Sequence, residues 1–456
     1  MHLWTSSGAP GRCLPEGFVS QAARRPRGCK VALRRARVPT SALALLASAM
    51  CFAWIGCTEA QPPAVSGQSP PVSQDLTPER VTPLTKPWQR VIPLQETPEG
   101  LPSLRASHCG ACHTAIYEEW AATTHAVALQ DLQFQAEWKK DGELWLCLNC
   151  HTPLENQMER LVTGLADGDF RTPVVNENPE FDPVLQAESI TCAVCHVRGG
   201  AILGPGLDGD TPHLVQTREG GFFQRTCEHC HNMQDRLTDT LICTFNTGDE
   251  WRASGRAAQG QGCVDCHMPA VTRPLVEGGD DRPGHRHTWF GAGIAKFPSD
   301  VETVRAAYHS GYDIELRAVH HREPTRPERV SIDLAIINSR AGHELPTGDP
   351  ERFITLELLL RDGRGSRLWA HTERIGELWQ WYPKAEQLSD NSLKPGERRE
   401  LSFDVPLPPA AGGGLRVELV ARNHRMTEEN ARAMGIQGRY PLAVETWRQT
   451  VPVGSN

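Results

Sequence analysis

Five short stretches of the chain share one pattern, and the first of them is Cys109-Gly110-Ala111-Cys112-His113. Two residues separate the cysteines, and a histidine directly follows the second cysteine. The same pattern recurs in Cys147-Leu148-Asn149-Cys150-His151, Cys192-Ala193-Val194-Cys195-His196, Cys227-Glu228-His229-Cys230-His231 and Cys263-Val264-Asp265-Cys266-His267. These stretches hold ten of the 15 cysteines in the 456-residue chain. Their chemistry therefore decides how this part of the chain folds.

A Cys-x-x-Cys-His motif supplies two thiols and one imidazole from about one helical turn. The thiols can bond to the two vinyl groups of a haem, while the histidine binds the iron from one side. Five motifs therefore predict five covalent c-type haems. The residues expected to hold them are Cys109, Cys112, His113, Cys147, Cys150, His151, Cys192, Cys195, His196, Cys227, Cys230, His231, Cys263, Cys266 and His267.

Two other uses of paired cysteines fit the pattern less well. Four-thiolate zinc sites combine such pairs two by two and need no histidine after them, so an odd number of pairs is unexpected. A thioredoxin-like redox centre needs only one pair. All five pairs are followed by histidine in a chain with only 18 histidines, which composition alone does not explain.

Residues 1–57 have the composition of an export signal. Seven arginines and lysines in residues 24–37 precede an apolar run at 41–56, which is too short to span a membrane comfortably. The run ends in Trp54-Ile55-Gly56-Cys57, which resembles the cleavage box of bacterial lipoproteins, so Cys57 is the expected lipidation site. The alternative is an ordinary signal peptide cut near Ala60. We therefore expect a protein of the bacterial periplasm or cell envelope, held on a membrane surface by a lipid.

After the leader the chain is acidic. The whole sequence has 47 basic and 55 acidic side chains, of which eight basic and one acidic lie in residues 1–57. The remainder has 39 basic and 54 acidic side chains, a net charge of about −15, which argues against a nucleic-acid partner. Residues 58–103 are rich in Pro, Gln and Ser and are expected to form an extended linker.

The rest of the chain divides into two expected domains. Residues 104–325 contain one motif for roughly every 40 residues, too little chain to bury a core unless haems help to fill it. Residues 326–456 lack the motif, and segments such as 330–336 and 353–360 have strand-like apolar content between turn residues. The expected fold class is therefore a multihaem cytochrome c domain of short helices and loops, followed by an all-β, sandwich-like domain.

The second axial ligand of each iron separates an electron carrier from a catalyst. His125 lies in a helix-like stretch after the first motif and is a candidate. His213, His285 and His287 stand in Pro- and Gly-rich loops, where no core would otherwise explain a histidine. Cys243 has no motif partner and is interpreted as a small buried residue, with iron ligation as the less favoured alternative.

Two parts of the chain resemble a known family. The first motif with Tyr117, Trp120 and His125 resembles the start of tetrahaem cytochrome c-554 domains, in which the histidine after the tryptophan is a distal ligand. The fifth motif followed by His285-Arg286-His287-Thr288-Trp289-Phe290-Gly291 resembles the closing part of the same multihaem class, where a histidine before an aromatic residue and glycine is again a ligand. The resemblance covers about residues 104–325 and implies a multihaem c-type cytochrome of the c-552/c-554 type. A fifth motif departs from the tetrahaem pattern.

One loop of the expected β domain also suggests a ligand. Ala341-Gly342-His343-Glu344-Leu345-Pro346-Thr347-Gly348 follows the first expected strand, and similar Gly-His-x-x-Pro-Thr-Gly stretches occur beside multihaem domains in proteins that this one resembles. His343 is either a turn histidine that hydrogen-bonds Glu344 or Glu351, or a ligand that reaches a haem across the domain boundary. We take the second as the hypothesis to test.

Three functions are compatible with these features. The favoured one is electron transfer through five haems between a donor and an acceptor protein. The alternative is a pentahaem reductase of a nitrogen or sulfur oxyanion with one open iron, although nitrite reductases of this size often have lysine in the catalytic motif and end in long helices. The third is a structural subunit of a surface complex or filament. No catalytic residue is assigned.

Overall fold

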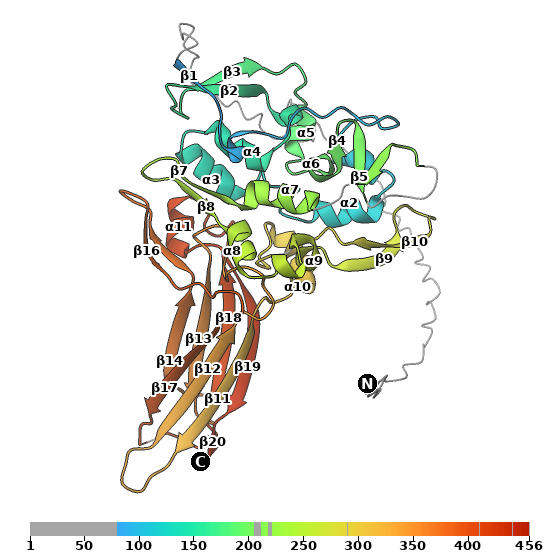
Figure 1. The fold of residues 1–456 in the computed structure, drawn as a ribbon. Helices are drawn as coiled ribbons and strands as arrows, with labels where there is room; N and C mark the ends of the chain where they lie inside the picture. Colours follow the sequence, from blue (N-terminus) through green and yellow to red (C-terminus); the bar gives the residue numbers. More distant parts are fainter. Residues whose placement is uncertain are drawn as a thin grey trace, which may run out of the picture. The chain divides into compact units, whose positions relative to one another are not determined.

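Each of the five motifs lies in a short helix or across its C-terminal end (Figure 1). The computed structural model describes residues 80–204, 211–217, 221–289, 291–409, 411–439 and 441–455. Cys57 and the whole leader lie outside these ranges. The motif helices are α1 (Ala106–Gly110), α4 (Trp145–His151), α6 (Cys192–His196), α7 (Phe222–His231) and α9 (Cys263–His267).

Proline limits the length of two of these helices. Pro153 and Pro269 each stand two residues after a motif histidine, and the residue before a proline avoids the α conformation. Thr152 and Met268 accordingly leave the helix, with φ of −146° and −125°. The first motif is shaped by a close contact instead, because a Cβ on Gly110 would lie 2.6 Å from Cγ of Tyr117. Only glycine fits there without a shift of the tyrosine.

The remaining elements of the helical region, which we define as residues 80–312, are short. The helices are η2 (Pro87–Gln89), α2 (Thr114–Ala121), α3 (Leu132–Lys140), η3 (Glu155–Gln157), α5 (Pro183–Ala187), α8 (Thr247–Ala253), η4 (Ala257–Gln259), η5 (Pro298–Asp300) and α10 (Val301–Ala307). The strands form small sheets, namely β1 (Val81–Thr82) with β2 (Arg160–Ala166) and β3 (Pro173–Glu177), β4 (Val197–Arg198) with β5 (Ala201–Gly204) and β6 (Val215–Thr217), β7 (Met233–Arg236) with β8 (Ile242–Phe245), and β9 (Ala270–Pro274) with β10 (Asp281–His285).

The expectation of an extended linker at 58–103 does not hold for residues 80–103. Strand β1 pairs with β2, and the backbone N–H of Ile92 donates to the Pro153 carbonyl at 2.7 Å. The buried Gln95 exchanges hydrogen bonds with Asn156. Polar composition suggested a tether, but these backbone and amide groups find partners on the helical region and become ordered.

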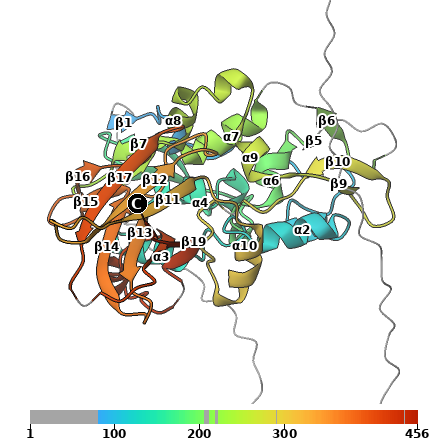
Figure 2. The ribbon, with the colours of Figure 1, turned by 90° about the horizontal axis from the view of Figure 1, so that it is seen from below.

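Two four-stranded sheets pack face to face in the C-terminal region (Figure 2). One has the order β17 (Arg398–Pro406), β12 (Arg329–Ile337), β11 (Asp313–His321) and β20 (Gly454–Ser455). The other has the order β14 (Arg367–Ile375), β13 (Phe353–Arg361), β18 (Arg416–His424) and β19 (Ala443–Pro452). Alternating residues of both sheets, such as Ile332, Leu334, Leu356 and Leu358, are fully buried between them, as a sandwich requires.

Three details differ from or add to the expected β domain. Strand β11 belongs to the sandwich, so the expected boundary at residue 326 falls inside the β11–β12 hairpin. A two-stranded hairpin, β15 (Glu377–Gln380) with β16 (Glu386–Asp390), stands apart from both sheets. A short helix, α11 (Glu428–Ala433), follows strand β18.

The two regions differ in how much protein core they have. The sandwich encloses one cluster of 18 buried residues, whereas the largest cluster of the helical region has six. This contrast fits the expectation that haems fill the helical region. All described residues belong to one unit, 66–456. None of the described helices is long and apolar enough to cross a bilayer.

Candidate haem-binding site

Four of the five motif histidines face a second histidine from elsewhere in the chain. The ring centroids of His113 and His213 are 6.4 Å apart, those of His231 and His125 6.3 Å, those of His196 and His287 6.1 Å, and those of His267 and His343 6.1 Å. The four distances differ by no more than 0.3 Å. Because four separate pairs have nearly the same centroid distance, we expect one common cause to set it.

An iron held between the two rings of each pair would account for that spacing. A metal bound by two imidazole nitrogens at about 2 Å each holds the ring centroids about 6 Å apart. None of the eleven described cysteines forms a disulfide, so the ten motif thiols remain available for thioether bonds. Within the described residues, no group of three or more His, Cys, Asp and Glu side chains is placed to hold a metal by itself. The donor set therefore fits covalent haem better than zinc.

Backbone carbonyls orient several of the imidazoles. Nδ1 of His113 lies 3.0 Å from the Leu275 carbonyl, Nδ1 of His151 2.7 Å from Ala128, and Nδ1 of His196 2.8 Å from Leu203. On the facing side, Nδ1 of His287 lies 3.1 Å from the His285 carbonyl, and Nδ1 of His343 2.8 Å from that of Glu344. A carbonyl accepts only from N–H, so Nδ1 carries the proton and Nε2 is left to bind iron.

Burial favours the neutral form of seven of the paired imidazoles, which is the form that binds a metal. It lowers the pKa of His125 to about 3, with His231 and His267 nearby lowering it further. Burial likewise lowers the pKa values of His231, His267 and His287 to about 4. The pKa values of His196, His213 and His343 are lowered for the same main reason. These seven imidazoles are therefore neutral at physiological pH.

The second motif differs from the other four. Among the ring contacts of the described residues, His151 has no histidine partner and instead stacks on Phe134, with centroids 3.6 Å apart and planes 15° apart. Phe134 lies in α3, whose N-terminus is capped by Asp131. Asp131 also forms an ion pair with the partly buried Lys296, and burial lowers the pKa of that lysine to about 8. Burial lowers the pKa of His151 to about 4, so this imidazole is also neutral.

The structure brings most of the proposed distal histidines to a motif histidine, but not all of them. His125, His213, His287 and His343 each face one, and ligation by them stays a prediction. His285 does not, because its ring is exposed and has no ring contact with a motif histidine among the described residues; its Nδ1 donates to the Met268 carbonyl. Sequence reasoning did not identify which motif each distal histidine would face, nor Phe134 beside His151. No signal in the sequence marks these long-range pairings.

The motifs lie close to one another in space. Thiol contacts join Cys109 to Cys192, Cys150 to Cys230, and Cys227 to Cys263. The first motif therefore lies beside the third, the second beside the fourth, and the fourth beside the fifth. Cys243 in β8 is partly buried and lies near Cys147 and Cys150, in agreement with its interpretation as a packing residue. Such proximity suits the passage of electrons between haems.

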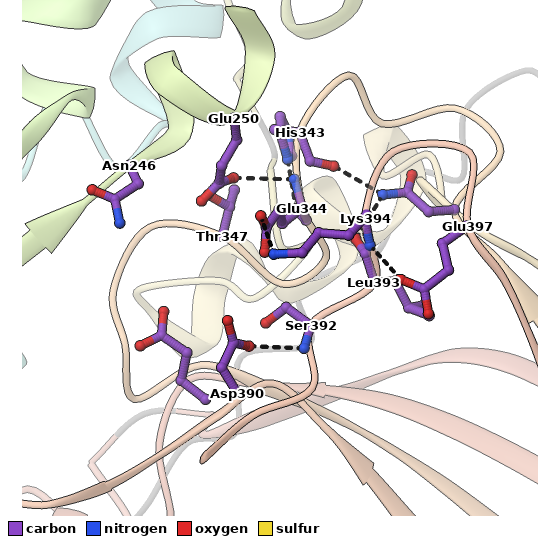
Figure 3. Close-up of polar contacts among 12 residues, drawn as sticks. Asn246, Glu250, His343, Glu344, Thr347, Asp390, Ser392, Leu393, Lys394 and Glu397 are labelled. Carbon is purple, nitrogen blue, oxygen red and sulfur yellow. Dashed lines mark hydrogen bonds and ion pairs between the residues drawn. The ribbon is translucent and has the colours of Figure 1, made fainter. Parts of the chain in front are cut away.

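The loop that holds His343 is fixed from both regions (Figure 3). Glu250 of α8 accepts hydrogen bonds from the Glu344 N–H at 3.0 Å and from Thr347 Oγ1 at 2.7 Å. Within the sandwich, Asn338 Nδ2 donates to the His343 carbonyl at 2.9 Å, and Lys394 forms an ion pair with Glu344. The turn interpretation of His343 is partly right, since its Nδ1 bonds Glu344, but through the backbone carbonyl. That bond leaves Nε2 without a proton, on a ring whose centroid lies 6.1 Å from that of His267.

Helices that carry Cys-x-x-Cys-His, imidazole pairs at one spacing and a small protein core are the features expected of a multihaem c-type cytochrome, here followed by a β domain. The family model for cytochrome c554 and c-prime matches residues 108–168. A solved penta-heme cytochrome c552 from Thermochromatium tepidum is similar in fold, with a TM-score of 0.54 and 18% identity, over 78% of this chain and 100% of that chain. A beta-glucuronidase from Bacteroides uniformis matches 30% of this chain and 13% of that chain, with 16% identity and a TM-score of 0.17. No curated protein matches the sequence. The expected fold class is confirmed.

Proposed function

We propose that this chain binds five covalent haems and transfers electrons through them. The observation that carries the proposal is the set of four imidazole pairs with centroids 6.1–6.4 Å apart. An iron with two protein ligands has no open position and suits electron exchange without binding a substrate. The contacts between thiols of different motifs support close packing of the haems, which such exchange needs.

Electron paramagnetic resonance of the oxidised protein tests this assignment. The four pairs predict four low-spin irons, and His151 predicts one iron that is high-spin or bound by water. Two or more high-spin irons would overturn the pairings. Five low-spin irons would support a pure carrier and would require a distal ligand for the second motif that the described side chains do not reveal.

A second candidate function rests on His151 alone. An iron held by His151 without a facing histidine has one position free for a small ligand, so the chain is also a candidate reductase of a nitrogen or sulfur oxyanion. The dithionite-reduced protein, freed of excess dithionite, should then be reoxidised by nitrite or sulfite, and carbon monoxide, which binds an open ferrous iron, should slow this. Reoxidation that is equally fast with and without carbon monoxide would rule out catalysis at this iron.

The cellular setting belongs to the same proposal. The basic leader and the Trp54-Ile55-Gly56-Cys57 box support export to the periplasm or cell envelope and a lipid anchor on a membrane surface. The partners are an electron donor and an electron acceptor protein. Nucleic acid is not expected to bind because of the acidic charge after the leader.

A further inference from the structure

One carboxylate outside the motifs accepts four hydrogen bonds next to a candidate iron ligand. Glu119 of α2 accepts at Oε1 from Arg273 Nη1 and Arg286 Nη1, both at 2.7 Å. Its Oε2 accepts from Arg273 Nη2 at 2.8 Å and from the backbone N–H of His287 at 2.9 Å. The Glu119 side chain is 13% exposed and that of Arg273 16% exposed, so the fork-to-fork pair is largely shielded from water. Bidentate, shielded pairs of this kind fix geometry strongly.

The carboxylate joins three segments that meet at the haem sites. Helix α2 begins directly after His113, the histidine of the first motif. Arg273 lies in β9, and the Leu275 carbonyl just after this strand orients Nδ1 of His113. The remaining two donors belong to the segment after β10 that carries His287, whose ring faces His196 at 6.1 Å. The Glu119 side chain is therefore hydrogen-bonded both to the backbone of His287 and to Arg273 of β9, the strand that precedes the carbonyl bonded to His113.

We infer that Glu119 is a positioning residue, which holds the His287 backbone so that its imidazole faces His196 at the distance an iron requires. This inference rests on the proposed function, because it takes His287 as an iron ligand. His287 follows the end of β10, and its Nδ1 bonds the carbonyl two residues before it, so the hydrogen bond to Glu119 is the one that links its backbone N–H to another element. Partners behind a ligand commonly change metal affinity by about 10–100-fold when they are removed.

The segment after β10 also contacts a second candidate ligand, through Trp289. Trp289, with φ of +40°, lies 5.0 Å from the His125 ring and 5.3 Å from the His287 ring, measured between centroids. His125 faces the fourth motif and His287 the third. The segment anchored by Glu119 therefore packs on distal histidines of two motifs, and its displacement should be felt first at His287, whose N–H the carboxylate holds directly.

The test uses the haem-loaded full chain with Glu119→Gln. An amide keeps one acceptor oxygen but turns an N–H₂ group toward the guanidinium of Arg273, so the fork-to-fork pair and one negative charge are lost. We expect one haem to change its low-spin signal and to move about tenfold toward the reduced form, about 59 mV upward in midpoint potential. Carbon monoxide should also bind to more irons per chain than in the wild type, because the His287 ligand is held less firmly.

Asp182→Asn is the matched control. Asp182 also accepts four hydrogen bonds, from Arg105 Nε and Nη2 and from the N–H groups of Val184 and Leu185, but it touches none of the paired histidines. It should lower stability without moving a single haem potential. If Glu119→Gln does not load haem, Arg273→Lys keeps the charge, loses the fork, and should shift the same haem in the same direction by less.

His287→Ala separates the inference from the proposed function. If this variant leaves all haem signals as in the wild type, His287 is no ligand, and both the pairing and the inference fail. If His287→Ala opens one iron while Glu119→Gln and Arg273→Lys keep wild-type potentials and carbon monoxide stoichiometry, only the positioning role is overturned. A shift of the same haem in all three variants, absent in Asp182→Asn, supports the inference.

Discussion

The imidazoles of His267 and His343 lie almost parallel, with ring planes 11° apart and centroids 6.1 Å apart. His267 ends the helix of the fifth motif, whereas His343 belongs to a loop of the sandwich. The same loop is hydrogen-bonded to α8 through Glu250. A sandwich that lacks the Cys-x-x-Cys-His motif thus places an imidazole beside the fifth motif, which makes His343 a candidate ligand of the iron there.

Replacing His343 by alanine should therefore change one haem only. The iron bound by His267 loses its second imidazole, so one low-spin signal should convert to high-spin and the other haems should keep theirs. Optical spectra and a redox titration of the purified protein measure this. His371→Ala is a suitable control, because His371 is a sandwich histidine that pairs with Glu373 rather than with a motif histidine. If His343→Ala and the wild type give identical titrations, the sandwich supplies no iron ligand and only packs against the helical region.

The local chemistry of the haem sites could be predicted from the sequence, but their pairing could not. Cys-x-x-Cys-His specifies its own geometry within one helical turn, so the attachment residues follow from spacing alone. The facing histidine comes from far along the chain, as with His113 and His213 or His267 and His343. Which loop reaches which motif depends on long-range packing, which leaves no periodic signal.

Long-range packing also explains where the observed fold differs from the expected one. Alternating apolar residues identified β12 and β13, because one face of each strand packs in the core. Strand β11 has His320 and His321 at its end, and these polar residues made it look like the tail of the haem domain. The segment 80–103 is ordered through hydrogen bonds to groups such as Asn156 and Pro153, which composition does not reveal.

A haem count follows from the five motifs. Each supplies two thioether bonds, so the denatured wild-type protein should keep five covalent haems by mass. Cys150→Ser leaves one thiol in the second motif, so this variant should lose one haem or hold it unstably while the other four remain. Because Cys150 contacts Cys230 of the fourth motif, the fourth haem is the one to examine for a secondary change. A wild-type mass with four haems or fewer would contradict the stoichiometry.

The leader makes a prediction about location. If Cys57 is lipidated, the wild type should sediment with membranes, and Cys57→Ser should be released or misprocessed with its haems still attached. Fractionation followed by a haem stain measures both. A soluble wild type whose N-terminus lies beyond Cys57 would favour the ordinary signal peptide.

A group of buried carboxyls makes stability depend on pH. Burial raises the pKa of Glu351 to about 8, and the nearby Asp349 raises it further, although Asn430 and Lys140 act the other way. Glu137, also buried, faces the same group and has a raised pKa for similar reasons. A carboxyl that keeps its proton in the folded state binds more protons than the unfolded chain, whose glutamates ionise near 4.5. Stability from this group therefore falls as pH rises from about 4.5 to about 8.

Replacing Glu351 by Gln should remove this loss of stability at high pH. The amide stays neutral at every pH and keeps the oxygen that accepts from Asn430 Nδ2, so the variant should equal the wild type near pH 4.5 and exceed it by about 1–3 kcal/mol at pH 8. Urea unfolding at both pH values, followed by circular dichroism, gives the difference. Glu418→Gln is the opposite case, because hydrogen bonds from Arg361 and Arg416 lower the pKa of Glu418. That variant should lose stability above pH 4.5 and recover as the pH falls. A Glu351→Gln protein that is less stable than the wild type at pH 8 would show that this carboxyl is ionised and paired in the folded state.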